Sequence, residues 1–430
     1  MSVNIGAALA RLLRLLPILL LAPPSAATQT GGPALPVEGP QAVSLWAMEF
    51  QRLRRPRVTP RDGAPDWFEL GLSVIAEWNT IPLGGIQQRS SGRVLTTFDG
   101  ELDLGRLFAE SHAGKLAVVA QSMGAEDGGS LDSGDFQIYS NLESDENRDD
   151  VMELWYEQDF AASGARLKVG KVDANSEFAY VEVAGDFSHS SAGFSPSIVG
   201  FPSYPDAATS VNLFIDTLSP WEGTTATLGY GLYDGSLAVD GVRTGRLGPS
   251  TFLSSDRSDD LLHLLQWEII ADRGQTEKTR VTLGAFRHTG QFERFDGGTD
   301  HGTEGLFATW EHSVRRPDLP RGHIHFFAQY GWADDRVSPI SEHAAAGLVF
   351  DGPLEHRPDD RAGIYASLAD LSDAAGAGFA SNELAIDAYY RLRWSERFWV
   401  QPEVQLIVDP SGSETISDAL VLGLRIAAEF

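Results

Sequence analysis

Acidic and basic side chains recur at alternate positions in three segments of the chain, 93–104, 151–160 and 165–171. Alternate positions of a β-strand point to the same face of a sheet, so each segment presents its charges on one face and its apolar residues on the other. Carboxylates accept hydrogen bonds, while guanidinium and ammonium groups donate them. Neighbouring strands of this kind offer both partners to a solute rich in hydroxyl groups. The charged candidates for contact with such a solute are Arg93, Asp99, Glu101, Asp103, Glu153, Glu157, Arg166 and Lys168.

The longest connection between such segments, residues 172–208, combines polar and aromatic side chains. Carboxylates and amides beside aromatic rings suit a pyranose, which has hydroxyl edges and an apolar face. We therefore add Asp173, Asn175 and Glu177 to the candidates for sugar contact. Two alternatives remain open: the aromatic residues pack this connection onto a wall, and the charges only pair with one another. The aromatic residues concerned are Phe187, Phe194, Phe201 and Tyr204.

Enzyme chemistry has little support in the sequence. No H-E-x-x-H, G-x-S-x-G, G-x-G-x-x-G or phosphate-binding G-x-x-x-x-G-K motif occurs, and there is no cysteine. His323 and His325 share one strand face, but no third metal ligand is evident. Asp and Glu total 60, so their spacing alone cannot nominate a glycosidase pair. An outer-membrane hydrolase would need a Ser–His pair at one rim, and none is convincing. We expect no enzyme, no cofactor and no metal site.

The elements that must position these residues are β-strands. From Trp67 onward, segments of eight to twelve residues alternate apolar and polar positions and are separated by Gly, Asp, Ser and Pro. We count sixteen. The connections are long after odd-numbered segments and short after even-numbered ones, which is typical of an outer-membrane barrel with long external loops and short periplasmic turns. The sequence predicts an all-β fold: a transmembrane antiparallel up-and-down β-barrel of about 16 strands, closed by the C-terminal strand.

The two faces of the predicted C-terminal strands differ in polarity, as expected for a barrel wall between lipid and water. In 418–430, Leu424, Ile426 and Phe430 share one face, while Arg425 and Glu429 share the other. Sixteen strands leave an aqueous lumen, whereas eight would be filled by side chains. A water-filled pore is therefore the expected product, with a soluble secreted carbohydrate-binding β-protein as an alternative. Aromatic residues at strand ends predict the interfacial girdles: Trp78, Trp332, Tyr390 and Trp394.

The N-terminus predicts export. Residues 1–27 contain Arg11 and Arg14, a short apolar stretch and small residues, as in a signal peptide cleaved after Ala27. An uncleaved anchor helix is the alternative. We divide the remainder into a periplasmic N-terminal segment, 28–66, and a barrel domain, 67–430. The net charge of −27 disfavours nucleic acid as a partner, and no run of 18 apolar residues predicts a helical span.

Several segments in the same order resemble the carbohydrate-selective porin family (OprB type). The resemblance covers 67–430, but the family's tryptophan- and glycine-rich opening motif is not evident around 45–66. It implies a sixteen-stranded barrel that passes mono- and small oligosaccharides by diffusion, narrowed by a long early loop that folds inward. The segments that carry it are ELWYEQDF (153–160), LKVGKVDANSEFA (167–179), GWADDRVSPISEHAAAGLVF (331–350), RPDDRAGI (357–364), 382–410 and DALVLGLRIAAEF (418–430).

This reading places the protein in the outer membrane, with small sugars as its transported solutes. A general, non-selective porin is the alternative. Outer-membrane lipid is an expected partner, because the acidic stretch 143–150 is either solvated or bridged by divalent ions to lipopolysaccharide phosphates. Whether the barrels form a homo-oligomer is left open.

Overall fold

The computed structural model describes residues 67–430, apart from 110–112, 127, 143–146, 161, 237, 240–241, 254–259, 273–276 and 317–321. The expected signal peptide and N-terminal segment, residues 1–66, lie outside the described residues. Among the described residues, no helix is long and apolar enough to cross a membrane.

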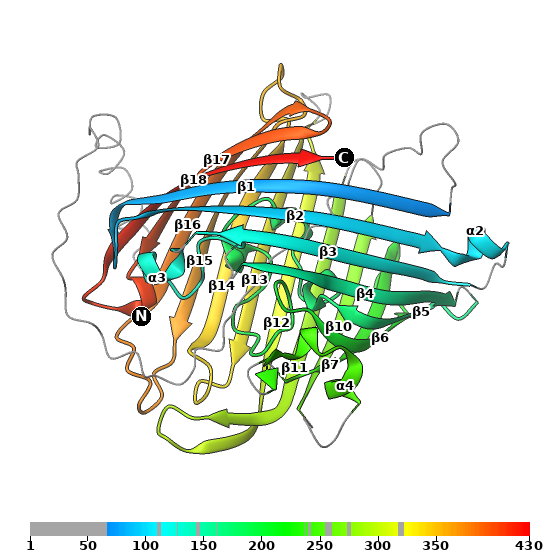
Figure 1. Ribbon diagram of the computed structural model, residues 1–430, viewed down its shortest axis with the longest axis horizontal. Coiled ribbons are helices and arrows are strands. Elements are labelled where there is room, and N and C mark those ends of the chain that lie inside the picture. Colours follow the sequence, from blue (N-terminus) through cyan, green and yellow to red (C-terminus); the bar gives the residue numbers. More distant parts are fainter. Residues whose placement is uncertain are drawn as a thin grey trace. The chain divides into compact units, whose positions relative to one another are not determined.

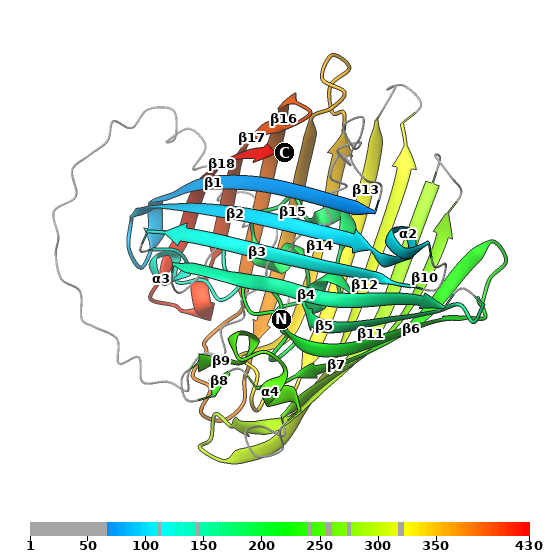
Figure 2. The same ribbon diagram turned by 45° about the vertical axis from the view of Figure 1, so that its right-hand side comes forward.

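Sixteen tilted antiparallel strands close into a barrel over the described part of the chain (Figures 1 and 2). Each strand pairs with its sequence neighbour, as an up-and-down topology requires. The strands are β1 Phe68–Gly85, β2 Ser90–Asp103, β3 Lys115–Ala125, β4 Arg148–Phe160, β5 Ala165–Val172, β6 Ala208–Thr217, β7 Thr224–Asp234, β10 Leu261–Asp272, β11 Glu277–Glu293, β12 Thr299–Arg315, β13 His323–Ala333, β14 Ile340–Asp351, β15 Arg361–Leu371, β16 Glu383–Ser395, β17 Phe398–Val408 and β18 Ser417–Glu429. A separate two-stranded sheet holds β8 Ala238–Val239 and β9 Val242–Arg243.

The C-terminal strand closes the barrel against the first strand, as the sequence predicts. Trp78 of β1 is opposite Leu424 of β18. The backbone N–H of Phe430 donates to the Leu72 carbonyl at 2.8 Å, and that of Leu72 donates back at 3.1 Å. Closure pairs the backbone of both edge strands, which a hydrocarbon environment requires because it offers no other partner.

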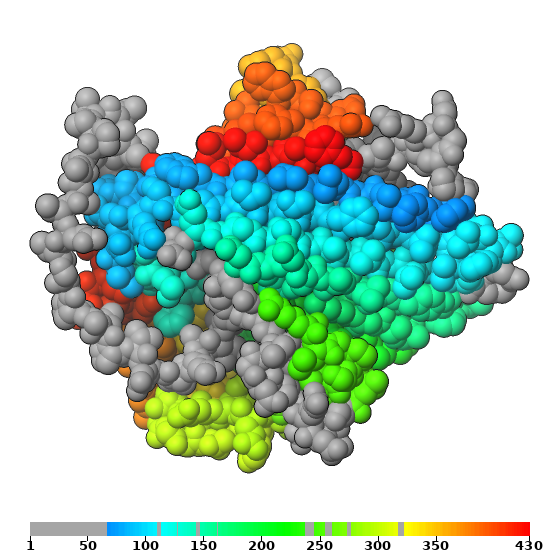
Figure 3. All heavy atoms as spheres, viewed as in Figure 1, coloured from blue at the N-terminus to red at the C-terminus, as the bar shows by residue number. Residues whose placement is uncertain are grey.

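The outer face of the barrel is apolar and the inner face polar. On β18, Leu424 and Ile426 are exposed, while Arg425 between them is buried. Figure 3 shows the continuous outer surface of β1 to β4. Of the four residues predicted for the girdles, Trp78, Trp332 and Trp394 are exposed, and Tyr390 is half-buried. Large apolar side chains are exposed in the same way on other strands: Leu72, Val94, Leu154, Leu213, Leu265, Leu283, Leu306 and Ile364.

Three strands, β1, β11 and β12, are much longer than the sequence predicts, and this weakens the expected alternation of loop lengths. β1 continues to Gly85 through a register shift between Thr80 and Leu83, so its connection to β2 is only 86–89. β11 continues to Glu293 through a shift between His288 and Gln291. A bulge interrupts the two-residue alternation without ending the strand, and the alternation is what marked the expected ends. Connections 126–147, 173–207 and 235–260 remain long.

Two of these long connections fold into the barrel (Figure 1). We call residues 173–207 the inward segment; it contains η1 Ala174–Ser176, η2 Glu182–Ala184 and η3 Ser190–Ala192. Residues 130–142, beginning with α3 Ser130–Ser133, form a second inward segment. The two pair through the Asn141 N–H, which donates to the Ser188 carbonyl at 2.6 Å. The other helices are α2 Leu104–Phe108, η4 Thr244–Arg246, α4 Pro249–Phe252 and η5 Pro410–Gly412.

Aromatic packing fixes the inward segment to the inner wall. Phe187 is fully buried, and its ring centroid lies 4.7 Å from that of Tyr365, 4.8 Å from Tyr389 and 5.9 Å from Phe327. Phe194 packs on Phe201 at 4.7 Å. The sequence left open whether the aromatic rings of this segment contact a sugar or pack on the wall. The Phe187 ring packs on the wall. The inward segment is thus packed against the inner wall of the barrel.

Candidate functional site

Four predicted site residues form one ion cluster where β4, β5 and the inward segment meet. Glu177 accepts hydrogen bonds from Lys168 Nζ at 2.7 Å and from Arg166 Nη2 at 2.7 Å. Arg166 also donates through Nη1 to Glu157 Oε2 at 2.7 Å. Alternation along β4 and β5 turns Glu157, Arg166 and Lys168 into the barrel, where the inward segment brings Glu177 to them.

Aromatic rings support the cations of this cluster. The Arg166 guanidinium lies over the Phe214 ring at 4.0 Å from its centroid, and Lys168 Nζ lies over the Trp155 ring at 3.9 Å. Cation–π contacts of this kind stabilise a cation more strongly when water is excluded. They hold Arg166 in a fixed direction, with a ring below and carboxylates on two sides.

Asp173, Asn175 and Glu153 hold the base of the inward segment. The Asp173 N–H donates to Glu153 Oε1 at 2.9 Å, and Asp173 Oδ1 accepts from Ser203 Oγ at 2.7 Å and from the Asn175 N–H at 2.9 Å. Burial and the nearby Glu153 carboxylate raise the pKa of Asp173 to about 7. Asp173 and Asn175 are buried, so in this structure their hydrogen bonds to the protein fix the chain where it leaves the wall.

Arg93 lies in a different environment from the Arg166 cluster. Its Nη1 is 3.2 Å from Glu77 Oε1, and Glu77 also accepts from Arg425 Nε at 2.6 Å and from Ser140 Oγ at 2.5 Å. Arg93 is only 2% exposed, under the second inward segment. The sequence did not indicate this cover, because residues 130–142 carry no strand or motif signal.

The remaining predicted residues of β2 do not reach the Arg166 cluster. Lys115 Nζ donates to Glu101 at 2.6 Å, and Asp103 caps α2 by accepting from the Arg106 N–H at 3.0 Å. Asp99 is half-buried on the same inward face. These residues lie toward the end of the barrel that carries the chain's C-terminus, because β2 ends there.

The acidic stretch 143–150 is described only in its second half. Residues 143–146 lie outside the described residues, while 148–150 begin β4. Arg148 is buried; it forms an ion pair with Asp150 and lies 3.4 Å from Asp206 in the inward segment. Asn147 and Asp149 are exposed, so hydration or ion bridging of this stretch stays a prediction.

A cavity of about 600 Å³ opens beside Arg166, and we call it the Arg166 cavity. Its volume is within the range of small-molecule sites. Of its lining residues, Arg166 and Glu177 were sequence candidates, whereas Tyr180, Gln266 and Glu268 are among those that were not. Gln266 and Glu268 alternate on β10, so periodicity alone gave their face but not their proximity to Arg166. The other polar and aromatic lining residues are Asp159, Ser176, Glu177, Phe214, Asp216 and Thr227.

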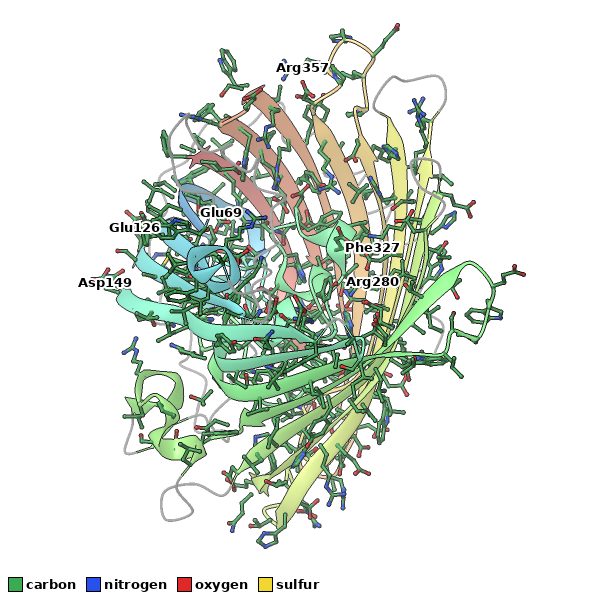
Figure 4. All side chains as sticks on the ribbon, turned by 90° about the vertical axis from the view of Figure 1, so that its right-hand side faces the viewer. Glu69, Glu126, Asp149, Arg280, Phe327 and Arg357 are labelled. Atoms are coloured by element: carbon green, nitrogen blue, oxygen red, sulfur yellow. The ribbon has the colours of Figure 1, made fainter. Side chains whose placement is uncertain are left out.

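Arg280 on β11 supports the far side of this cavity. Its Nε donates to Glu268 at 2.5 Å, its Nη1 donates to Glu311 at 2.8 Å, and its guanidinium lies 3.6 Å from the Tyr180 ring centroid. Figure 4 shows Arg280 inside the barrel, close to the inward segment. Strand β11 thereby positions both Glu268 and Tyr180 at the cavity.

Within the described ranges, no group of three His, Asp or Glu side chains is placed to hold a metal ion. His325 bonds to the Asp351 carboxylate at 2.9 Å and to Ser313 Oγ at 2.7 Å. His323 stacks against His325, with their ring centroids 5.9 Å apart. The two histidines thus form part of a hydrogen-bonded wall.

Comparison with known proteins agrees with this architecture. Residues 244–430 match the family model described as "Carbohydrate-selective porin, OprB family". This segment is less than half of the chain, and it is similar to that family. No curated protein matches the chain. The matched segment contains β10 to β18, nine of the sixteen wall strands, including the closing strand.

The fold extends this similarity over the rest of the barrel. The high-pH structure of Pseudomonas putida OprB has a TM-score of 0.72 at 14% identity, covering 84% of this chain and 94% of that chain. The low-pH structure of the same protein has a TM-score of 0.52 at 13% identity, covering 84% of this chain and 92% of that chain. At these identities the likeness concerns the fold. The match over residues 244–430 and the barrel fold together support an outer-membrane porin of the carbohydrate-selective kind.

Proposed function

We propose that mono- and small oligosaccharides cross this porin by passive diffusion and are contacted at the Arg166 cavity. The observation that carries the proposal is the ion cluster beside it, where one guanidinium binds two carboxylates, Glu157 and Glu177. Sugar hydroxyls both donate and accept, so a wall with both kinds of group replaces part of their hydration shell. The paired charges offset one another, which limits the preference for ions of either sign.

The accessible groups of the cavity suit this role. The Arg166 side chain is 28% exposed, against 2% for Lys168, so Arg166 is the cation of the cluster within reach of a solute. Glu268 lines the cavity and supplies an acceptor. Gln266 is committed to the inward segment, because its Oε1 accepts from the Ala179 N–H at 2.9 Å. We assign sugar contact to Arg166 and Glu268, and support of the cavity to Glu157, Lys168, Glu177 and Gln266.

The inward segment supports a constriction of fixed width. Wall carboxylates hold its backbone: Glu311 accepts from the Val183 N–H at 2.9 Å, and Glu403 accepts from the Ser188 N–H at 2.8 Å. Asp186 forms ion pairs with Arg361 at 2.6 Å and with Arg391 at 2.5 Å. A segment anchored on several strands keeps its side chains in place while solutes pass, which lowers the ordering cost of each contact.

A general porin without sugar preference is the second candidate. Its support is the same charge pairing, because ions already satisfied by one another give a solute less to gain. The remaining predictions stay proposals too: export by a signal peptide cleaved after Ala27, a periplasmic segment 28–66, and a homo-oligomer. N-terminal sequencing of the membrane form and sedimentation in detergent test them directly.

Swelling of proteoliposomes tests sugar passage. Purified full-length mature protein is reconstituted, and swelling is compared for monosaccharides, small oligosaccharides and amino acids of matched size. Faster swelling with sugars supports the proposal, while equal rates for all small solutes favour the general porin. Arg166→Ala identifies the site: we expect sugars to block the ion current about tenfold less well, the order of one charged hydrogen bond. Arg397→Ala, in the exposed β16–β17 turn, is the matched control and leaves the block unchanged.

A further inference from the structure

A second cavity lies on the outer face of the barrel, and we call it the outer-wall pocket. Its volume is about 390 Å³, and it spans β7, β10, β11, β12 and β13. It is separate from the pore, because its charged, aromatic and leucine side chains occupy the outward-facing positions of the strands, which alternate with the inward-facing ones. These side chains are Tyr230, His263, Leu265, Arg287, Leu306 and Trp332.

The pocket lies toward the external end of the wall. His263 is near the start of β10, just after connection 235–260. Trp332 is near the end of β13, just before connection 334–339. The short turns 161–164 and 396–397 and the C-terminal Phe430 mark the opposite, periplasmic end. Tyr230 and Trp332 are both exposed on the outer face. Amphipathic rings of this kind favour the level of the lipid headgroups.

The polar part of the pocket offers donors to an anion. Tyr230 Oη and His263 Nδ1 are 2.8 Å apart, so the two rings share a hydrogen bond. Arg287 Nη1 is 3.6 Å from Glu304 Oε2, beyond hydrogen-bond length, and the Arg287 side chain is 67% exposed. A guanidinium presents two parallel donors that match the oxygens of a phosphate. Arg287 thus points a cation at the headgroup level of the membrane.

The other part of the pocket is apolar and exposed. Leu265 and Leu306 are 49% and 55% exposed on the outer wall. Leu306 is two residues from Glu304 on β12, and Leu265 is two residues from His263 on β10, which pairs with Arg287. Trp332 of β13 is paired with Leu306. This surface matches an acyl chain that continues from a phosphorylated headgroup into the membrane. The Glu304 carboxylate matches the hydroxyl groups of a sugar to which the phosphate is attached.

We propose that the outer-wall pocket binds lipopolysaccharide through a phosphorylated sugar of its membrane anchor. Arg287 and His263 bind the phosphate, Glu304 accepts hydrogen bonds from sugar hydroxyls, and an acyl chain lies on Leu265, Leu306 and Trp332. The charge and the apolar surface of the pocket both lie on the outer face, so this site does not depend on the pore. It would fix the orientation of the wall in the outer leaflet.

Binding of purified deep-rough lipopolysaccharide to the full-length mature protein in detergent, followed by native mass spectrometry, tests the proposal. We expect Arg287→Ala and Arg287→Gln to weaken binding about fivefold, the order expected for one cation near a charged lipid. Arg397→Ala, an exposed arginine at the other end, is the control and should bind as the unchanged protein does. Heat-modifiable gel migration shows that each variant is a folded barrel.

Two comparisons identify the ligand. Lipopolysaccharide stripped of its anchor phosphates should bind both Arg287 variants and the unchanged protein equally. Leu306→Ala should weaken lipid binding, and inorganic phosphate alone should compete poorly. Equal binding by Arg287→Ala and the unchanged protein overturns the proposal, as does an equal loss in Arg397→Ala. Competition by inorganic phosphate as strong as by the lipid overturns the lipid assignment and indicates a free-phosphate site.

Discussion

Lys168 and Glu177 form an ion pair of 2.7 Å whose side chains are almost completely removed from solvent. Lys168 lies on β5, and Glu177 lies just beyond the point where the chain turns into the barrel. A buried ion needs a partner, because its desolvation costs several kcal/mol. This pair therefore ties the position of the inward segment to the wall strand that precedes it, and it holds Glu177 where Arg166 also reaches it.

Removal of one member of this pair should destabilise the barrel. In Lys168→Met, Glu177 loses its buried ammonium partner while Arg166 remains, and we expect the free energy of unfolding to fall by about 3 kcal/mol. Lys278→Met is the control, because Lys278 forms a 3.3 Å exposed pair with Glu182, a kind worth up to about 1 kcal/mol. Denaturant unfolding in detergent measures both. Equal losses in the two variants would show that burial of the Lys168 pair has no special role.

Asp173 should make stability depend on pH. Its pKa is raised to about 7, against about 3.9 for an unfolded aspartate, so the folded protein binds this proton more tightly. The free energy of unfolding should fall as pH rises from about 4 to about 7, by up to ~4 kcal/mol from this group, and level off above. Asp173→Asn should flatten this slope. The exposed-site variant Asp216→Asn should keep it, and a slope that persists in Asp173→Asn would assign the effect elsewhere.

Asp186 should respond to acid in the opposite direction. The guanidinium groups of Arg361 and Arg391 overcome the effect of burial and lower its pKa. Its contribution to stability is therefore present above the unfolded value of about 3.9 and is lost as pH falls through its folded pKa. Asp186→Asn should release the middle of the inward segment and raise current noise in planar bilayers at pH 7. An unchanged noise spectrum would show that the other anchors suffice.

Phe187 should act through packing alone. Phe187→Ala leaves a cavity against Tyr365, Tyr389 and Phe327, and we expect a loss of about 3–5 kcal/mol. Phe187→Leu keeps most of the volume and should cost much less. Leu253→Ala, at an exposed position, is the control. Larger and more variable single-channel conductance in Phe187→Ala would accompany the loss, whereas wild-type conductance with normal stability would contradict this role.

The sequence alone determined the barrel architecture and the charged residues of β4 and β5 at the site. Alternation of apolar and charged residues predicts which face of each strand meets lipid, because lipid accepts only one kind of side chain. It therefore identified sixteen strands and closure by Phe430. It also placed Glu157, Arg166 and Lys168 on facing sides of adjacent strands, and the structure added Glu177 from the inward segment to them. The sequence did not predict the ends of β1 and β11, because bulges after Thr80 and His288 interrupt the two-residue alternation.

Only the tertiary structure decided where the long connections go. Arg93 and Arg166 look alike in sequence, yet one is buried under Ser140 while the other borders a cavity. Gln266, Glu268 and Arg280 meet the inward segment from strands about a hundred residues away, and no local pattern records that contact. The physical reason is that periodicity depends on the nearest neighbours along one strand. The path of a connection depends instead on packing and ion pairing with the whole wall.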